Sequence, residues 1–347
     1  MTSFFVPKPH SRKPLSRIYV DANQFSHPEH LLSNLPDYFS LLPIKKRYKP
    51  STKPSSISPV YNLRSRNQKE NIEPKPKNPQ TVPDYLNEIL AYYLETDRTS
   101  KPLYGYMERQ TEINMKMRGI LIDWLVDVHL KFKLTPETLY LTVNLIDRYL
   151  FNVNVQRTKL QLVGITCLFI ACKYEEIYPP ELKDHVYITD QTYTKDEIIK
   201  MEESILKCLS FDITFPTALR YLEVFTETLN DGDDDITTTE VFLFSRYLLE
   251  LSLVEYTMLK YTNGEIAISA YYISYKMNKE MLCSLGRIAK AFGYDEERIK
   301  ECSKDICTIL DNAESYWLHA VKKKFSLEQY KNVANWKKYM IYKSNTK

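Results

Sequence analysis

Residues 117–125 read MRGILIDWL, and this stretch decides the fold. Its apolar residues recur at intervals of three and four, which places them on one wide face of a helix. The pattern extends on both sides and predicts a helix over Met115–Lys133. So broad an apolar face has to be covered by other helices. It consists of Met117, Ile120, Leu121, Trp124, Leu125 and Val128.

Outward from this helix, the same periodicity predicts four more helices up to residue 209 and another five after Pro216. Capping patterns such as Thr135-Pro136-Glu137 and Thr194-x-x-Glu197 mark the helix starts. Nothing in the chain indicates a strand, so the expected fold class is all-α, with five helices repeated as five again. The expected helices are Thr135–Phe151, Arg157–Lys173, Glu181–Val186, Thr194–Leu209, Thr217–Leu229, Glu240–Glu255, Asn263–Met277, Ser284–Ala291 and Asp295–His319.

The first 83 residues differ from the rest in composition and charge. They hold 13 of the 18 prolines and a net charge of +9, whereas residues 84–347 carry −6. Such a segment buries too little apolar surface to offset the entropy of ordering it. We therefore expect a disordered basic tail over 1–83, helical domains over 84–214 and 215–325, and a C-terminal extension over 326–347.

Several classes of protein are excluded by composition. The chain has only 7 glycines and no G-x-G, so it carries neither a dinucleotide fingerprint nor a kinase-type glycine loop. The six cysteines form no C-x-x-C pair and the histidines do not cluster, so no metal, cofactor or disulfide framework is expected. Free cysteines in apolar helices are typical of a reducing compartment. No signal peptide is recognisable, and the longest apolar run, Leu162–Cys172, is shorter than the ~20 residues that span a bilayer, so no membrane partner is expected.

A series of short motifs follows MRGILIDWL in a fixed order. With these spacings the chain resembles a cyclin, specifically a mitotic cyclin of the B type, with an A-like mitotic type as the alternative. The resemblance is dense from Tyr85 to Thr217 and continues more loosely to about residue 320. It implies two stacked five-helix cyclin folds that bind and activate a cyclin-dependent kinase at entry into mitosis, in nucleus and cytoplasm. The motifs are NLIDRYL (144–150), LQLVG (160–164), ACKYEEIYPP (171–180), YTK (193–195), Met201-Glu202 and LSF (209–211).

The resemblance assigns a kinase-binding surface. Lys173 and Glu202 match the family's charged pair, which meets backbone groups of the kinase's mobile helix. The alternative is an ion pair that only holds two helices together. For the aromatic and aliphatic residues of the surface, the alternative is packing in the core. They are Tyr174, Phe211 and Ile213, with Tyr85, Ile89 and Tyr92, which recur at helical spacing on a leading helix that Pro83-Asp84 opens.

A second surface in the resemblance is a substrate-docking patch for Arg-x-Leu segments of substrates and inhibitors. An apolar groove would take the leucine, and an acid would attract the arginine. We assign Leu125 and Val128 to the core, and Arg118 with Asp147 to a buried structural ion pair. Gly119 stands where the family often has alanine. The patch residues are Met117, Ile120, Leu121, Trp124, Asp127, Leu160 and Gln161.

The tail contains two sequences that resemble destruction signals. Lys69-Glu70-Asn71 matches the KEN degron read by the anaphase-promoting ubiquitin ligase. Arg12-x-x-Leu15 resembles a destruction box, although Val20 stands where Asn or an acid is usual. The resemblance therefore implies timed, ubiquitin-dependent destruction. The alternative is that the tail is a solvated basic linker.

Two other functions compete with this interpretation. An enzyme is disfavoured because Glu175 and Glu176 are adjacent and so point apart on a helix, the histidines are isolated, and no kinase HRD or DFG element is present. A transcription-type cyclin or general transcription factor adaptor shares the helical fold. Its binding to nucleic acid would call for a basic body, whereas residues 84–347 are net acidic. We therefore expect no catalytic residues and no direct nucleic-acid partner.

Overall fold

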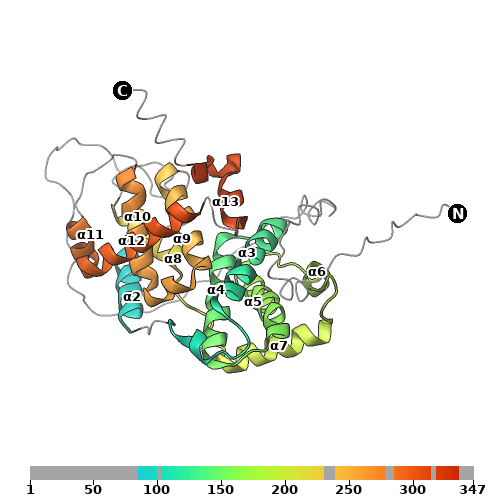
Figure 1. The fold of residues 1–347 in the computed structure, drawn as a ribbon. Coiled ribbons are helices and arrows are strands. Elements are labelled where there is room, and N and C mark those ends of the chain that lie inside the picture. The colour runs from blue at the N-terminus through green and yellow to red at the C-terminus, as the bar shows by residue number, and fades with distance from the viewer. Residues whose placement is uncertain (1–84, 100–102, 230–238, 278–284, 314–317, 336–347) are drawn as a thin grey trace.

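The computed structural model describes residues 85–99, 103–229, 239–277, 285–313 and 318–335, and every regular element within these ranges is a helix (Figure 1). None of the described helices is long and apolar enough to cross a membrane. Short 3-10 turns lie at Tyr106–Arg109, Arg157–Lys159, Tyr256–Lys260, Glu328–Tyr330 and Val333–Asn335. The α-helices are α2 (Leu86–Thr99), α3 (Met115–Phe132), α4 (Pro136–Asn152), α5 (Leu160–Glu175), α6 (Leu182–Ile188), α7 (Lys195–Cys208), α8 (Ala218–Leu229), α9 (Glu240–Val254), α10 (Asn263–Met277), α11 (Leu285–Phe292), α12 (Glu296–Asn312) and α13 (Ala320–Phe325).

Helices α3–α7 form the first fold around α5, which packs against α3, α4 and α7. Helix α5 is buried along most of its length because its residues are apolar almost all round. Gly164 permits the close approach of α3, since a Cβ atom there would lie 2.6 Å from Leu121 Cδ1. The side chain of Asn114 caps α3 by accepting the amide hydrogen of Met117 at 3.0 Å.

Helices α8–α12 form the second fold in the same way around α10, which packs against α8, α9 and α12. The two folds share apolar surface, because Ile122, Val126 and Leu139 of the first fold belong to the core cluster of the second. The prediction of two tandem five-helix folds is confirmed.

The two ends of the described chain cross over between the folds. Helix α2 precedes the first fold but packs against α8 and α10 of the second. Helix α13 follows the second fold and packs against α3 of the first as well as α9 (Figure 1). Each fold is therefore covered by a helix from the opposite end of the chain.

The prediction of one long helix over Asp295–His319 is wrong. Helix α12 ends at Asn312, and a separate helix begins at Ala320 with His319 as its N-cap. The new helix buries Val321 and Phe325 at 3% and 0% exposure and packs against both α3 and α9. Packing also continues beyond residue 325, because Ala334 is buried in the second core at 2% exposure.

Candidate functional site

An ion pair lies on an exposed face of the first fold. Lys173, in the last turn of α5, donates from Nζ to Glu202 Oε1 on α7. The side chain of Lys173 is 43% exposed and that of Glu202 16%. The Lys173 ammonium also lies 4.2 Å from the ring centroid of Phe169, which holds it over the helix surface. The pair is therefore formed and accessible in the same conformation.

Two aromatic side chains assigned to the same surface are also exposed. Tyr174 is 46% exposed, and its hydroxyl is 2.7 Å from the hydroxyl oxygen of Thr214. Phe211 is 66% exposed and follows α7 with a φ of 59°, next to Ser210 at 54°. Left-handed backbone is unfavourable for such residues and recurs at functional sites. Here it ends α7 and leaves the Phe211 ring in solvent, while Ile213 packs partly buried against the first core.

The leading helix presents a second group of exposed aromatics. Tyr85 and Tyr92 are 61% and 57% exposed, whereas Ile89 packs partly buried against the second core. A hydrogen bond next to Tyr92 holds α2 against the second fold: the backbone carbonyl of Tyr93 accepts from Tyr221 Oη on α8 at 2.6 Å.

Asp97, near the end of α2, makes further hydrogen bonds that hold this helix on the second fold, and the sequence did not reveal them. Its Oδ2 accepts hydrogen bonds from Thr262 Oγ1 and Tyr294 Oη, both at 2.7 Å. Burial raises the pKa of this carboxyl, and the hydrogen bonds partly offset that rise. Gly264 makes room for it, since a Cβ there would lie 2.4 Å from Asp97 Oδ2. No sequence signal links Asp97 to partners some 165 residues away.

Arg118 and Asp147 meet in the interior rather than at the surface. Arg118 Nε lies 2.6 Å from Asp147 Oδ1, and Nη2 lies 2.7 Å from Oδ2, in a bidentate pair. The third nitrogen donates to the carbonyls of Leu253 and Val254 at 3.0 and 3.2 Å. The two side chains are only 1% and 2% exposed. This pair therefore joins α3, α4 and the end of α9, and no partner protein can reach it.

The structure divides the docking-patch residues into two groups. Met117, Ile120, Trp124 and Asp127 are partly exposed on α3. Leu121 and Leu160 are each 0% exposed, so the expectation that they contact a docked segment directly is not met, because both are used in the core beneath. Gln161 is 4% exposed, and its Oε1 has no hydrogen-bond partner among the described residues.

Helix α13 borders this patch, which the sequence did not indicate. Asp123 Oδ1 on α3 accepts the amide hydrogen of Ala320 at 2.9 Å and so satisfies the first turn of α13. Burial raises the pKa of Asp123 to about 7. Burial also raises the pKa of Asp127, and the nearby charge of Lys323 partly offsets this rise. The acidic edge of the patch is thus shaped by the C-terminal helix.

Gly119 does not lie in the patch. A Cβ there would lie 3.2 Å from Leu318 Cδ1, just before α13. The glycine therefore affects how the C-terminal helix approaches α3 and not the docking surface. The candidate degron residues Lys69, Glu70, Asn71, Arg12 and Leu15 lie outside the described residues.

Comparison with known proteins agrees with this architecture. The family model of the cyclin N-terminal domain matches residues 88–214, and that of the cyclin C-terminal domain matches residues 216–339. The two matches meet between α7 and α8, where the first fold gives way to the second. The chain belongs to the cyclin family.

Mitotic cyclins of both types are among its relatives. The chain is 39% identical over 257 residues to the G2/mitotic-specific cyclin-B of Dictyostelium discoideum, which covers 74% of this chain and 58% of the relative. It is 40% identical over 263 residues to cyclin-A2 of Gallus gallus, covering 74% of this chain and 64% of the relative. The match to the G2/mitotic-specific cyclin-B of Marthasterias glacialis is 38% over 299 residues, covering 84% of this chain and 75% of the relative. The chain thus spans about three fifths of the first two relatives.

Solved structures support the fold. A viral cyclin from herpesvirus saimiri superposes with a TM-score of 0.58 at 19% identity, covering 65% of this chain and 96% of the viral chain. A chain of the yeast RNA polymerase II CTD kinase CTDK-1 complex gives a TM-score of 0.51 at 18% identity, covering 62% of this chain and 73% of the other.

Proposed function

We propose that this chain is a regulatory subunit that binds and activates a cyclin-dependent serine/threonine kinase at entry into mitosis, in nucleus and cytoplasm. The observation that carries the proposal is the accessible Lys173–Glu202 ion pair, together with the exposed rings of Tyr174 and Phe211 on the same fold. Aromatic residues around a few charged groups are typical of the energetic centre of protein interfaces. The names of the mitotic relatives support the timing.

The proposed mechanism is allosteric and needs no catalytic residue in this chain. The buried Arg118–Asp147 pair and the central helix α5 hold the exposed face in one shape before binding. A preformed surface that contacts only the active arrangement of the kinase's mobile helix shifts the kinase toward that arrangement. The free energy of binding is then converted into activation.

Substrate docking is the second part of the proposal. Met117, Ile120 and Trp124 offer apolar surface, and Asp127 supplies a carboxylate beside it. Gln161, at 4% exposure, lies beneath this surface with Leu121 and Leu160 and supports it from the core. Docking would raise the effective concentration of a tethered substrate at the kinase.

Timed destruction is the third part. It rests on the sequence alone, on Lys69-Glu70-Asn71 and Arg12-x-x-Leu15 in the proline-rich segment, which the anaphase-promoting ubiquitin ligase would read. Replacement of residues 69–71 by alanine should lengthen the protein's lifetime at mitotic exit. An unchanged half-life would remove this part and leave kinase activation intact.

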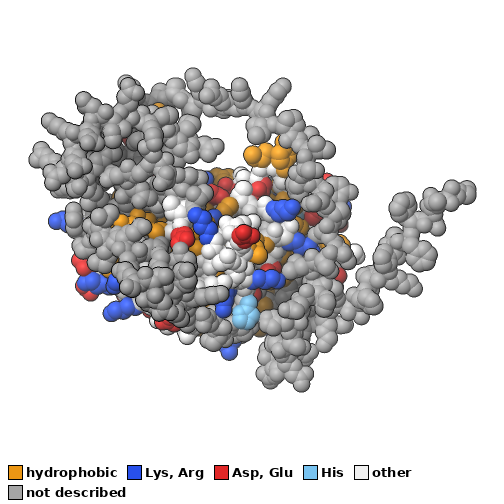
Figure 2. Space-filling view, turned by 90° about the horizontal axis from the view of Figure 1, so that it is seen from above, with side chains coloured by type: hydrophobic (Ala, Val, Ile, Leu, Met, Phe, Trp, Pro, Cys, Tyr) orange, Lys and Arg blue, Asp and Glu red, His pale blue; other side chains and the backbone are white. Residues whose placement is uncertain are grey.

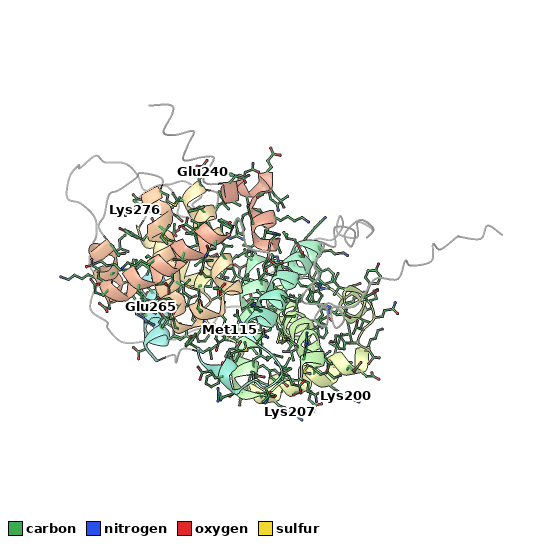
Figure 3. All side chains as sticks on the ribbon, in the orientation of Figure 1. Met115, Lys200, Lys207, Glu240, Glu265 and Lys276 are labelled. Atoms are coloured by element: carbon green, nitrogen blue, oxygen red, sulfur yellow. The ribbon has the colours of Figure 1, made fainter. Side chains whose placement is uncertain are left out.

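The test of the main proposal is recovery of a kinase with the full chain, followed by activity measurement with and without it. The double variant Lys173→Ala/Glu202→Ala should lose activation while helical content is retained. The matched control is Glu203→Ala/Lys207→Ala, which removes an exposed ion pair of 2.6 Å within α7, the helix that also carries Glu202. Figure 3 labels Lys207 on this helix. Full activation by the first variant, or equal loss in the control, would refute the assigned surface.

The same purification distinguishes the adaptor alternative. On the face in Figure 2, Lys and Arg side chains are interspersed with Asp and Glu, without a basic tract among the coloured residues. Recovery on DNA and not with a kinase would favour the adaptor and overturn our proposal.

A further inference from the structure

Glu176 lies where the chain leaves helix α5, directly after the residues of α5 that belong to the candidate kinase-binding surface. Its amide donates to the backbone carbonyl of Cys172 at 3.0 Å and so ends the helix. The next two side chains, Ile177 and Tyr178, are 81% and 50% exposed. Glu176 therefore marks the point at which a buried helix becomes an exposed segment.

The side chain of Glu176 reaches the start of a different helix, α4. Its Oε1 accepts hydrogen bonds from Thr135 N at 2.7 Å, from Thr135 Oγ1 at 3.0 Å and from Thr138 Oγ1 at 2.5 Å. Thr135 is the N-cap residue of α4, and its own side chain makes no capping hydrogen bond. A carboxylate is stabilised at this end of a helix, because the first turn carries unpaired N–H groups and a partial positive charge. Glu176 thus supplies from α5 the anionic acceptor at the start of α4.

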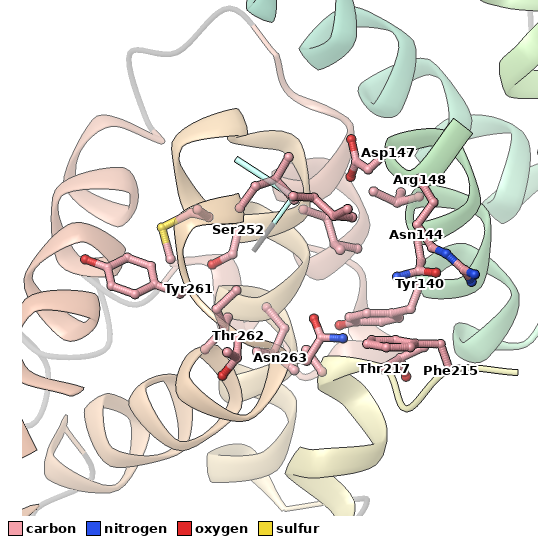
Figure 4. Close-up of a pocket in the computed structure, with 18 of the residues that line it drawn as sticks. Tyr140, Asn144, Asp147, Arg148, Phe215, Thr217, Ser252, Tyr261, Thr262 and Asn263 are labelled. Carbon is pink, nitrogen blue, oxygen red and sulfur yellow. The ribbon is translucent and has the colours of Figure 1, made fainter. Parts of the chain in front are cut away.

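Helix α4 is a firm support for this contact because it is packed into both folds. Leu139 belongs to the core cluster of the second fold, and Leu141 to that of the first. Further along the helix, Asp147 forms the buried pair with Arg118. Asp147 also lines a pocket between α4 and the second fold, opposite Ser252 (Figure 4). The start of α4 is therefore held in place, and with it the side chain of Glu176.

We propose that Glu176 is a positioning residue of the candidate kinase-binding surface: by joining the end of α5 to the start of α4, it holds the exposed segment 173–178 in the shape that binds the kinase. This inference rests on the proposed kinase-binding function. Without the three hydrogen bonds, only a fraction of the molecules has the binding shape. The apparent affinity for the kinase then falls by the same fraction.

The first measurement uses the free full chain and involves no kinase. In Glu176→Ala the backbone amides of residues 174–178 should exchange with deuterium about tenfold faster than in the wild type, because the contact with α4 no longer opposes local opening. Amides of the second fold should exchange as in the wild type. Unchanged exchange over 174–178 overturns the proposal.

The second measurement titrates the full chain against the kinase that the wild type recovers. Glu176→Ala should raise the concentration for half-maximal activation about tenfold, the value for a binding shape present in about one molecule in ten. Activity at saturation should stay at the wild-type level, because the bound state keeps the same kinase contacts. An unshifted half-maximal concentration beside a normal wild type overturns this inference alone, whereas failure of the wild type to recover a kinase overturns the proposed function.

Thr138→Val separates positioning from direct contact with the kinase. Thr138 is 0% exposed, so its hydroxyl influences a partner only through Glu176. The change should raise the half-maximal concentration about threefold, because one of the three hydrogen bonds is lost, and should have no effect in the Glu176→Ala background. Wild-type affinity in Thr138→Val would show that Glu176 touches the kinase itself. Equal losses in both backgrounds would show that the two residues act independently, and either result overturns the proposal.

Thr142→Val is the matched control on the same helix. Thr142 is also 0% exposed, and its hydroxyl donates to the backbone carbonyl of Thr138 at 2.6 Å rather than to Glu176. This variant should keep the wild-type affinity and exchange. Glu176→Gln retains a side-chain oxygen as acceptor and should recover most of the affinity lost in Glu176→Ala. An equal loss in Thr142→Val, or no recovery in Glu176→Gln, contradicts the role of the accepting oxygen.

Discussion

Two regions of the first fold contain the same kind of contact and use it differently. Arg118–Asp147 and Lys173–Glu202 each join residues 29 positions apart on two helices. The first pair is almost wholly buried where the two folds meet, and the second lies on an open face. Burial, more than the charges themselves, therefore decides how much an ion pair contributes to stability.

Buried and exposed ion pairs also differ in how much they contribute to the free energy of unfolding. Loss of one partner of a buried pair leaves an uncompensated charge in the interior, whereas an exposed pair is screened by water and contributes little. The interior of the first fold should therefore respond to mutation in stability, and its exposed face in binding. Mutations at the two kinds of site should therefore differ in size of effect, from the buried pair down to the exposed one.

The largest effect is expected at the buried pair. Arg118→Ala should lower the free energy of unfolding by about 3–5 kcal/mol, because Asp147 would remain buried without its counter-ion. The carbonyls of Leu253 and Val254 would also lose a donor, so the contact between the folds should weaken. Urea unfolding at neutral pH measures the change.

Arg148→Ala is the control for this measurement. Arg148 follows Asp147 directly and pairs with Asp212 at 3.3 Å, where the Asp212 side chain is 70% exposed. Its loss should change the free energy of unfolding by at most about 1 kcal/mol. Similar values for the two variants would break the division between buried and exposed pairs.

Helix α2 combines a buried anchor with exposed aromatic residues. A mutation of the anchor, Asp97, should therefore affect both stability and binding. Asp97→Ala should cost up to about 3 kcal/mol of stability, since the hydroxyls of Thr262 and Tyr294 lose their acceptor. Kinase affinity should fall as well, because Tyr92 lies on the same helix and Tyr85 directly precedes it. Tyr92→Ala, which removes an exposed ring, should reduce affinity alone. Unchanged affinity in Asp97→Ala would show that the second fold does not position this helix.

A pH dependence is expected from His129 on α3. Burial, with the nearby charge of Lys324, lowers the pKa of His129 from 6.5 to about 3. Because the folded-state pKa is depressed, stability is fully present above pH 6.5 and is lost as the pH falls toward 3. His129→Gln should therefore gain about 2 kcal/mol relative to the wild type between pH 7 and pH 5.

Asp123 on the same helix provides a control of opposite sign. Its folded-state pKa of about 7 lies above the ordinary 3.8, so its contribution is full below 3.8 and is lost as the pH rises through 7. As the pH falls from 7 to 5, the wild type gains this contribution and Asp123→Asn does not, so the variant should lose stability relative to the wild type. Parallel urea titrations of the three proteins decide this, and shifts of equal sign would contradict both assignments.

The smallest change in stability is expected at the exposed pair. Lys173→Ala/Glu202→Ala should alter the free energy of unfolding by at most about 1 kcal/mol, although kinase activation is lost. Thermal unfolding of the free protein measures this. A loss comparable to that of Arg118→Ala would show that the exposed pair is structural after all.

The sequence was sufficient for most of the helices because their apolar residues repeat with helical spacing. Its failures have physical causes. The apolar pattern of residues 295–319 predicted one helix, whereas α12 ends at Asn312 and α13 begins at Ala320 and buries Val321 and Phe325. Periodicity shows that a face is buried, but it does not show which partner covers it.

The candidate surfaces show the same limit. The match to the family's motifs assigned Leu121 and Leu160 to the docking patch. Both are buried in the structure, where α3 approaches α5 closely at Gly164. Asp97 and Glu176 gave no signal of their contacts, because only long-range packing brings their partners to them.

The exchange of end helices between the two folds has a consequence for cooperativity. Helix α2 precedes the first fold but lies on the second, and α13 packs against α3 of the first fold and α9 of the second, so opening either fold disturbs one of these end helices. Adjacent repeats usually form separate foldons, and here the crossed ends couple them into one. Truncation at either end should therefore be felt at the far side of the molecule, and the intact chain should melt in a single transition.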